Sequence, residues 1–494
     1  MLKVLMVNPV IRESEGAKHV PFGLAQLAAI TAGVGCHVQV FDCNAWRPTK
    51  RQVRDVLRAD DWDVVCMGGL VTTYGFVSSF AATTRQERPK ARIVLGGGII
   101  TPIPEDIMAL IPEIDVGVIG EGYRTWAELL RAFGEDERDL SDIDGIIWRD
   151  KVGELQVTPC RALVEELDTI PFPAWDMFPL ERYFANSSLL LSEEAMLSCR
   201  RLDICCSYGC PHQCRYCFHL GLSGELETRE INGHRTVVIT RKRKVRWHSP
   251  QYVTELMAQA RMRHGVDFFS FLDENFVALD RFTKGRWLNE FETLQESKGL
   301  RPGPGSGGPH WGATCHASLA EVNLLRRLRS MGCSYLDFGF ESFSDVILKE
   351  MHKGSTKHMN IKALEAAHKA GIRAIPNQII GFPNETVDTI LESLETWLRY
   401  DIQAAPFLAT PYPGSEWYYT FKERILGQYD GSLHAFLLDL GDATKVTAVI
   451  SENFNAVELL GLRELMAQRD IKRISQFKQE KDSPGHHEHP FCPF

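Results

Sequence analysis

The chain has 494 residues, of which 44% are hydrophobic, and this length suits about three domains with sizeable cores. Its formal net charge of −9 argues against a mainly electrostatic hold on nucleic acid, and no apolar run reaches the roughly 18 residues that span a bilayer. We expect a soluble, cytoplasmic protein whose thirteen cysteines serve metal or redox chemistry rather than disulfides, since the first residues predict a strand and not a signal peptide.

Residues 1–140 alternate short apolar strands with amphipathic helices, as parallel βαβ units do. Strands are expected at residues 4–7, 37–41, 64–67, 93–95 and 116–119, which predicts a five-stranded, doubly wound, Rossmann-like domain. The carboxyl ends of these strands carry Asn8, Gly68, Gly69, Gly96, Gly97, Gly98, Gly120, Glu121 and Gly122. Glycines there let the backbone approach a large flat or phosphorylated ligand, although they could also serve only tight turns. No Gly-x-Gly-x-x-Gly follows the first strand, which disfavours a dinucleotide site of the usual kind.

Residues 141–195 are expected to form a connector that packs against its neighbours. Segments 142–148 and 155–157 could pair as a small hairpin, after which prolines at 171, 173 and 179 stop regular structure.

A second α/β series fills residues 196–415. Strands are expected at residues 202–206, 268–272, 312–316, 335–340, 374–380 and 404–409, each preceded by a helix, which predicts a partial (β/α)6 TIM-like barrel. Cys210, Asp273, Glu341 and Gly381 fall at the carboxyl ends of these strands, where such barrels collect their functional loops. Residues 416–494 predict a small helical region, with periodicity over 459–468, that could close the barrel mouth and ends in a disordered tail.

The most informative segment is the loop that carries Cys210, Cys214 and Cys217. This spacing lets three thiolates bind three irons of a [4Fe-4S] cluster and leaves the fourth iron open to a substrate or cofactor. A zinc loop completed by His212 or His219 is the alternative at this point.

With its neighbours, this loop resembles the radical S-adenosylmethionine enzymes, and within them the cobalamin-binding branch. The resemblance covers about residues 1–415 and rests on motifs in order: Tyr216 before Cys217, Asp273-Glu-Asn275, Gly339-Phe-Glu-Ser342, Lys353-Gly354, Gly381-Phe-Pro-Asn-Glu-Thr386 and Pro411-Tyr-Pro-Gly414. The combination disfavours the zinc loop, and His212 is then expected to be a loop residue rather than a ligand.

The resemblance implies that the open iron chelates S-adenosylmethionine and that reductive cleavage yields a 5'-deoxyadenosyl radical. It places Tyr216, Phe218, Glu341, Ser342, Ile379, Gly381 and Phe382 at this cofactor. Glu341 could instead be a buried carboxylate tied to a neighbouring Lys or Arg. Asp273 and Asn275 could face the substrate or brace the cofactor, and the sequence leaves both options open.

For the N-terminal domain the resemblance implies cobalamin on the glycine-rich edge. The segment Leu70, Val71, Thr72, Thr73 and Tyr74 is placed to cover one corrin face. The chain lacks Asp-x-His-x-x-Gly, so no histidine ligand is expected below the cobalt. Some relatives keep this fold without cobalamin, which is the alternative.

The sequence therefore predicts a cobalamin-dependent radical S-adenosylmethionine enzyme that methylates an unactivated carbon through methylcobalamin. Alternatives are a radical cyclisation or ring rearrangement, and a corrinoid or iron-sulfur sensor of redox state or light without turnover. The expected partners are a small-molecule or peptide substrate and a low-potential electron donor of the flavodoxin or ferredoxin type, with no nucleic acid and no membrane span.

Two further features have no assigned role. The basic run 240–246 is interpreted as a solvated hairpin or strand edge, although it could receive an acidic substrate or reductant. The histidines of residues 486–489, with Cys492, could bind a metal but are expected to belong to the disordered tail.

Overall fold

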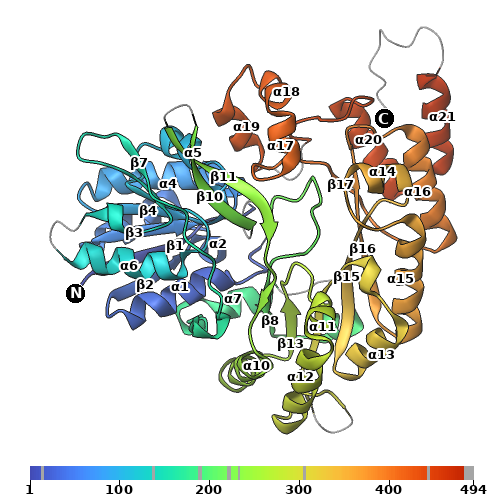
Figure 1. Ribbon diagram of the computed structural model, residues 1–494, viewed down its shortest axis with the longest axis horizontal. Helices are drawn as coiled ribbons and strands as arrows, with labels where there is room; N and C mark the ends of the chain where they lie inside the picture. Colours follow the sequence, from blue (N-terminus) through green and yellow to red (C-terminus); the bar gives the residue numbers. More distant parts are fainter. Residues whose placement is uncertain are drawn as a thin grey trace.

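The computed structural model describes residues 1–12, 16–135, 139–186, 192–219, 224–231, 234–303, 307–441 and 446–482. Figure 1 shows an N-terminal α/β domain beside a curled barrel sheet, with helices from the C-terminal region above the junction of the two. The histidines near the end of the chain lie outside the described residues. In the part that is described, no helix is long and apolar enough to cross a membrane.

The N-terminal domain is built on one seven-stranded sheet. Its spatial order is β2 (His37–Asp42), β1 (Lys3–Asn8), β3 (Val64–Gly68), β4 (Arg92–Gly96), β5 (Val116–Val118), β6 (Ile146–Arg149) and β7 (Leu155–Val157). The first five strands are parallel, as the sequence predicted. The expected hairpin forms as β6 and β7, and it extends this sheet by antiparallel pairing with β5. The order reverses direction between β1 and β3, where open α/β sheets bind ligands at their carboxyl edge.

Helices cover both faces of this sheet (Figure 1). Helices α1 (Phe22–Gly33) and α6 (Gly122–Gly134) pack on one face, where Ala28, Trp126 and Leu129 join one apolar core. Side chains of α3 (Lys50–Arg58), α4 (Tyr74–Glu87) and α5 (Pro104–Leu110) join a second core. The remaining short elements are α2 (Cys43–Trp46), η1 (Val71–Thr73), η2 (Gly97–Ile99), η3 (Leu140–Asp142), η4 (Leu167–Thr169), η5 (Trp175–Met177), α7 (Leu180–Ala185) and α8 (Glu193–Leu197).

The predicted partial barrel is confirmed as a six-stranded parallel sheet. Its order is β8 (Arg201–Ile204), β13 (Phe268–Phe271), β14 (His310–Cys315), β15 (Cys333–Glu341), β16 (Arg373–Ile380) and β17 (Phe407–Leu408). Leu202, Phe269, Trp311 and Phe338 belong to one continuous core with the surrounding helices. These helices are α10 (Pro250–His264), α11 (Ala278–Thr283), α12 (Arg286–Ser297), α13 (Val322–Ser330), α14 (Asp345–Glu350), α15 (Lys357–Ala370) and α16 (Val387–Arg399), with η6 (Ala317–Leu319).

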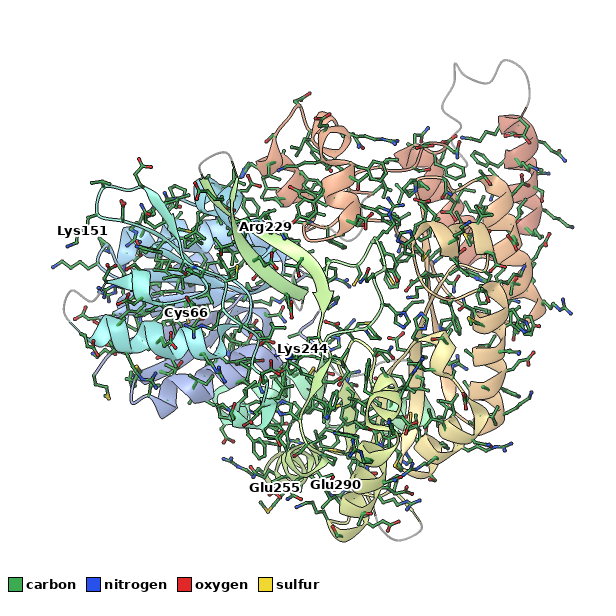
Figure 2. The ribbon with its side chains drawn as sticks, in the orientation of Figure 1. Cys66, Lys151, Arg229, Lys244, Glu255 and Glu290 are labelled. Atoms are coloured by element: carbon green, nitrogen blue, oxygen red, sulfur yellow. The ribbon has the colours of Figure 1, made fainter. Side chains whose placement is uncertain are left out.

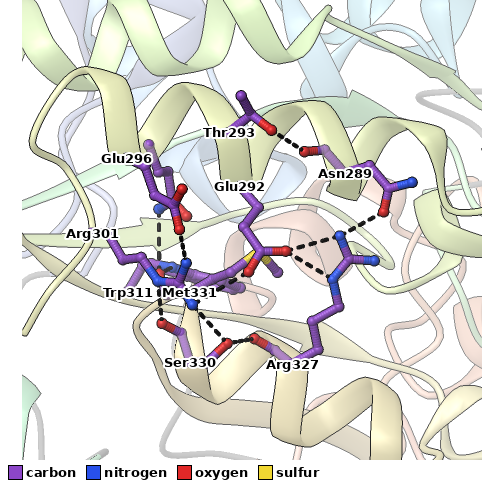
Figure 3. Close-up of polar contacts among 10 residues, drawn as sticks. Asn289, Glu292, Thr293, Glu296, Arg301, Trp311, Arg327, Ser330 and Met331 are labelled. Carbon is purple, nitrogen blue, oxygen red and sulfur yellow. Dashed lines mark hydrogen bonds and ion pairs between the residues drawn. The ribbon is translucent and has the colours of Figure 1, made fainter.

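A polar network ties the helices to the amino ends of the barrel strands (Figure 3). Arg327 on α13 donates to the carboxylate of Glu292 on α12 at 3.0 Å. The indole of Trp311, at the start of β14, donates to the Met331 carbonyl at 2.8 Å. This end of the sheet is braced, which leaves the carboxyl ends for functional loops.

An antiparallel hairpin of β10 (Gly224–Ile231) and β11 (His234–Arg243) follows the cysteine loop, and the sequence had suggested such a hairpin only for its basic end. It crosses to the N-terminal domain in Figure 1, and Leu226 lies beside Gly120 there. The hairpin is flanked by a two-stranded ribbon of β9 (Ser207–Tyr208) and β12 (Arg246–Trp247). In Figure 2, Cys66 lies within the N-terminal domain, while Lys244 lies at the base of the hairpin.

The C-terminal region folds as α17 (Glu416–Thr420), α18 (Lys422–Gly427), α19 (Leu433–Asp439), α20 (Ala456–Ala467) and α21 (Ile471–Lys481). It divides between the two domains, because α19 packs on α4, while α20 contacts β17 and α21 contacts α16. The domain boundaries at 140, 195 and 415 stay predictions.

Candidate active site

A cavity of about 1140 Å³ lies between the carboxyl ends of the two sheets. Four parts of the chain share its wall. They contribute Tyr216, Cys217, Phe218 and His219 from the cysteine loop, Glu341, Asn377, Ile379 and residues 407–410 from the barrel strands, Val10, Thr72, Thr73, Gly75 and Phe76 from the N-terminal domain, and Tyr412, Leu438, Leu440, Gly441 and Arg463 from the segments after the barrel. The cavity is therefore a feature of the assembled chain and not of either domain alone.

The cysteine loop is anchored on its outer side by Arg215. Its backbone N–H donates to the Met351 carbonyl at 3.0 Å, and its guanidinium donates to Glu350 at 2.6 Å and to Glu416 at 2.9 Å. Cys214 is buried and Cys217 reaches the cavity. The loop thus takes its shape from α14 and α17 as well as from its own sequence.

Asp273 supports the segment that leads into this loop. Its carboxylate accepts from the backbone N–H of Cys206 at 3.2 Å and from the Ser207 hydroxyl. Burial raises the pKa of Asp273, which is 1% exposed. Asn275 accepts from the backbone N–H of His316 at 3.3 Å. Both residues, whose role the sequence left open, therefore brace neighbouring loops, and neither lines the cavity.

Tyr216 and Glu341 line the cavity beside the cysteines, and both interlock with the buried side chain of Lys353. The Tyr216 hydroxyl donates to Glu341 Oε1 at 2.8 Å, and Lys353 Nζ donates to both groups at 2.9 Å. Glu341 has a φ of 61°, a left-handed conformation that this contact must hold. Burial acts to lower the pKa of Lys353, but the Glu341 carboxylate and the neighbouring thiolates outweigh burial and raise it. The ammonium is therefore charged, and Glu341 has the lysine partner that the sequence allowed as one reading.

The other residues expected at S-adenosylmethionine divide into two groups. Ile379 and Phe218 line the cavity. Ser342 is buried beside Ser393, Phe382 packs on Trp417, and neither reaches the cavity wall. Gly381 has a φ of 95°, and its N–H donates to Glu385 at 2.5 Å. Burial raises the pKa of Glu385 to about 8.

The segment expected to cover the corrin reaches the cavity through Thr72 and Thr73. Leu70 lies outside the wall, and its carbonyl accepts from the Thr73 hydroxyl at 2.8 Å. Tyr74 is buried behind the wall, where its hydroxyl bonds to His434 on α19 at 2.6 Å. Asn8, also buried, donates to Asp42 at 2.8 Å and does not line the cavity.

The glycine edge gives a backbone surface beside this segment. A Cβ on Gly97, whose φ is 83°, would lie 2.9 Å from the Gly69 carbonyl oxygen, so these two turns pack as only glycine allows. Gly68, Gly96 and Gly98 belong to the same pair of strand ends. Gly120, Glu121 and Gly122 follow β5 outside the cavity wall, and Glu121 bonds to Arg246.

Sequence reasoning missed several residues of this wall. Lys353 was noted only as part of a motif, without a contact. Phe76, Leu438, Leu440 and Arg463 had no local signal, because an apolar or basic residue on a helix looks the same whether it faces a core or a cavity. Only the expectation that the C-terminal region closes the barrel mouth pointed towards them.

Comparison with known proteins defines the class. Residues 9–130 match the B12 binding domain family and residues 204–396 match the Radical SAM superfamily. The chain belongs to the cobalamin-binding radical S-adenosylmethionine enzymes.

The chain is 27% identical to an uncharacterized methyltransferase of Pyrococcus horikoshii, over 86% of this chain and 84% of that one. It is 23% identical to an anaerobic magnesium-protoporphyrin IX monomethyl ester cyclase of Synechocystis, over 83% and 74%. The structure of a radical S-adenosylmethionine methyltransferase from Kitasatospora setae, with cobalamin and a [4Fe-4S] cluster bound, superposes with a TM-score of 0.65 at 16% identity and covers 86% of this chain and 79% of that one.

The cofactors of this family are a [4Fe-4S] cluster, S-adenosylmethionine and cobalamin, and the residues present fit them. Cys217 opens on the cavity from a loop with two further cysteines. Among the described residues, no three His, Cys, Asp or Glu side chains converge closely enough for a single ion. A cubane cluster asks for wider spacing, since each thiolate binds a different iron. The cavity volume of about 1140 Å³ suits a large ligand, and the close packing of Gly69 and Gly97 leaves no side chain on either turn.

Proposed function

We propose that this protein is a methyltransferase that acts on an unactivated carbon of a small molecule or peptide. The observation that carries the proposal is the shared cavity. Cys217 from the cysteine loop, Glu341 from the barrel and Thr72 from the N-terminal domain all line it. A methyl group can pass from a carrier on the N-terminal domain to a substrate beside the cysteine loop only if both open on the same space.

We assign the cluster to Cys210, Cys214 and Cys217. When bound, the cluster and cobalamin supply one-electron cleavage of S-adenosylmethionine and a carrier for its methyl group. The Glu341 carboxylate is positioned to accept hydrogen bonds from an amine or hydroxyl of S-adenosylmethionine, and the hydrogen bond from Lys353 orients that carboxylate. Phe218 and Ile379 give the adjoining wall its apolar character.

The same wall protects a reactive carbon-centred species. Ile379 and Leu408 from the barrel, together with Leu438 and Leu440 from the C-terminal region, present side chains that neither hydrogen-bond nor ionise. They keep water from the reacting carbon. Thr72 and Thr73 offer hydroxyls and no strong metal ligand on the N-terminal side, which suits a carrier that must change coordination.

A cyclisation or ring rearrangement is the second candidate, since one relative is named as a cyclase. The two differ in the fate of the methyl group of S-adenosylmethionine. A non-catalytic sensor would show no turnover of this cofactor.

The test is anaerobic incubation of reconstituted protein with dithionite, methyl-deuterated S-adenosylmethionine and a pool of candidate small molecules. Methylation adds three deuterons to a product and releases both S-adenosylhomocysteine and 5'-deoxyadenosine. A product that forms without label would refute methyl transfer and favour cyclisation. Absence of both nucleosides would refute the enzyme.

A matched pair of cysteine variants supplies the control. Cys214→Ala removes a proposed ligand, whereas Cys199→Ala changes an exposed cysteine that precedes β8 and lies eleven residues before Cys210. We expect only the first to lose the absorbance of the cluster and the formation of 5'-deoxyadenosine. Equal iron content in the two variants would contradict the ligand assignment.

A further inference from the structure

The basic run that the sequence left without a role ends in a buried ion pair between the two domains. Arg246, on β12, has a side chain that is only 3% exposed. Its guanidinium donates to the Glu121 carboxylate at 2.9 Å and to the Val164 carbonyl at 2.7 Å, while Glu121 also accepts from the Val164 N–H at 2.9 Å. Lys244 pairs with Glu165 at the base of the hairpin (Figure 2). These two members of the run therefore join the barrel to the N-terminal half of the chain.

A second bridge lies beside the first. The hydroxyls of Tyr208 and Tyr123 are 3.0 Å apart, and the Tyr123 hydroxyl also donates to Gln26 at 3.0 Å. Tyr208 and Arg246 face each other in the β9–β12 ribbon, where they are paired in register. Glu121 and Tyr123 lie at the start of α6. Both bridges thus connect the same helix start to the same ribbon.

One end of these bridges lies close to the cysteine loop in sequence, and the other lies at the start of α6. Tyr208 is two residues before Cys210, with only Gly209 between them. Glu121 directly follows Gly120, which lies two residues after the end of β5. It stands at the N-cap of α6, yet its carboxylate makes no cap hydrogen bond and is directed to Arg246 instead. These side chains therefore connect the segment that follows β5 with the segment that leads into the cysteine loop.

We propose that Arg246–Glu121 and Tyr208–Tyr123 are positioning residues that fix the separation and orientation of the cobalamin domain relative to the cluster. The inference rests on the proposed function, because a methyl carrier and a radical source must address one substrate carbon. Buried charged partners suit this task, since a displaced guanidinium would be left without its carboxylate in a dry interface. The bridges act on geometry and do not touch the reacting atoms.

The test compares holoenzyme variants by electron paramagnetic resonance, with cob(II)alamin and the reduced cluster both paramagnetic. In the native protein we expect one reproducible magnetic splitting between the centres. Two double variants remove a bridge without leaving a lone buried charge: Arg246→Met with Glu121→Leu, and Tyr208→Phe with Tyr123→Phe. We expect each to keep its iron and cobalt content and to lose at least half of the amplitude of the resolved splitting.

The control is an ion pair that lies outside the two bridges, between Arg200 and Glu181. Arg200 bonds to Glu181 of α7 at 3.0 Å and lies before β8, whereas the ribbon strand β9 lies after it. Arg200→Met with Glu181→Leu should leave the splitting unchanged. In cofactor-free protein, the two bridge variants should also raise hydrogen exchange at the ribbon amides at least tenfold, whereas the control should not.

Unchanged splitting in both bridge variants, at full cofactor content, would overturn the proposal, and so would a native protein without a resolved splitting. Neither measurement needs a substrate or counts a methyl group. A protein that proved to be a cyclase would give the same magnetic splitting. The labelling experiment can therefore refute methyl transfer without refuting the positioning role of the bridges.

Discussion

Replacement of Lys353 by Met tests how the cavity wall beside the cysteines is held. The change removes the ammonium and leaves the Glu341 carboxylate, which is 7% exposed, without its cationic partner. Breaking a buried pair in this way costs about 3–5 kcal/mol, because the remaining charge is neither solvated nor compensated. The left-handed φ of Glu341 adds strain that the lost contacts no longer offset. We therefore expect local destabilisation of β15 and the cysteine loop by about 3 kcal/mol or more.

Native-state hydrogen exchange of cofactor-free protein measures this effect, because it reports the opening free energy of individual segments in a chain with several domains. The double variant Lys353→Met with Glu341→Gln should recover about half or more of the loss, since it leaves no charge unpaired. Lys357→Met is the matched control, because Lys357 pairs with Glu392 at 3.1 Å with both side chains partly exposed and should lose under about 1 kcal/mol. If Lys353→Met behaves like the control, the wall is not held by this pair.

Three further outcomes are expected from other parts of the chain. Gly97→Ala should destabilise the N-terminal domain by about 1–2 kcal/mol and lower its cobalamin content, since φ is 83° and the new Cβ would press on Gly69; unchanged thermal melting would contradict this reasoning. Burial raises the pKa of Glu385 to about 8, above its unfolded value, so its contribution to stability is full at low pH and falls as pH rises towards 8; Glu385→Gln should flatten this slope in urea unfolding between pH 5 and pH 8. Tyr74→Phe removes the bond to His434 and should cost about 1 kcal/mol, seen as faster hydrogen exchange in α19; equal exchange would refute that contact.

Most strands could be predicted because each carries its own signal. Residues 37–41 alternate polar and apolar side chains and form most of β2, while the largely apolar residues 335–340 form the central part of β15. The cysteine spacing likewise lies within eight consecutive residues, so one segment of sequence contains the proposed ligand set. Local patterns of this kind survive folding because they do not depend on what the rest of the chain brings near them.

Partners from distant segments could not be predicted in the same way. Arg246 and Glu121 are 125 residues apart, and a basic run reads as solvated until its acidic partners are in place. Tyr74 is a second example, since the resemblance placed it at the corrin face and nothing in its local sequence indicated that its hydroxyl bonds to His434 on α19. A single sequence shows which residues each segment contains, but it does not show which segments pack against one another.

The cysteine loop shows why the C-terminal region belongs to the site. The Arg215 guanidinium bonds to Glu350 on α14 of the barrel and to Glu416 on α17, which follows the last barrel strand. The Trp417 N–H also donates to the Arg215 carbonyl at 3.2 Å. These contacts reach the backbone and the charged side chain of Arg215, which lies between Cys214 and Tyr216 in the loop. Because α17 both contacts this loop and begins the segment that carries Leu438 to the cavity, the same helix links the cysteine loop to the C-terminal part of the cavity wall. The barrel can therefore complete its active site only with residues that follow its last strand.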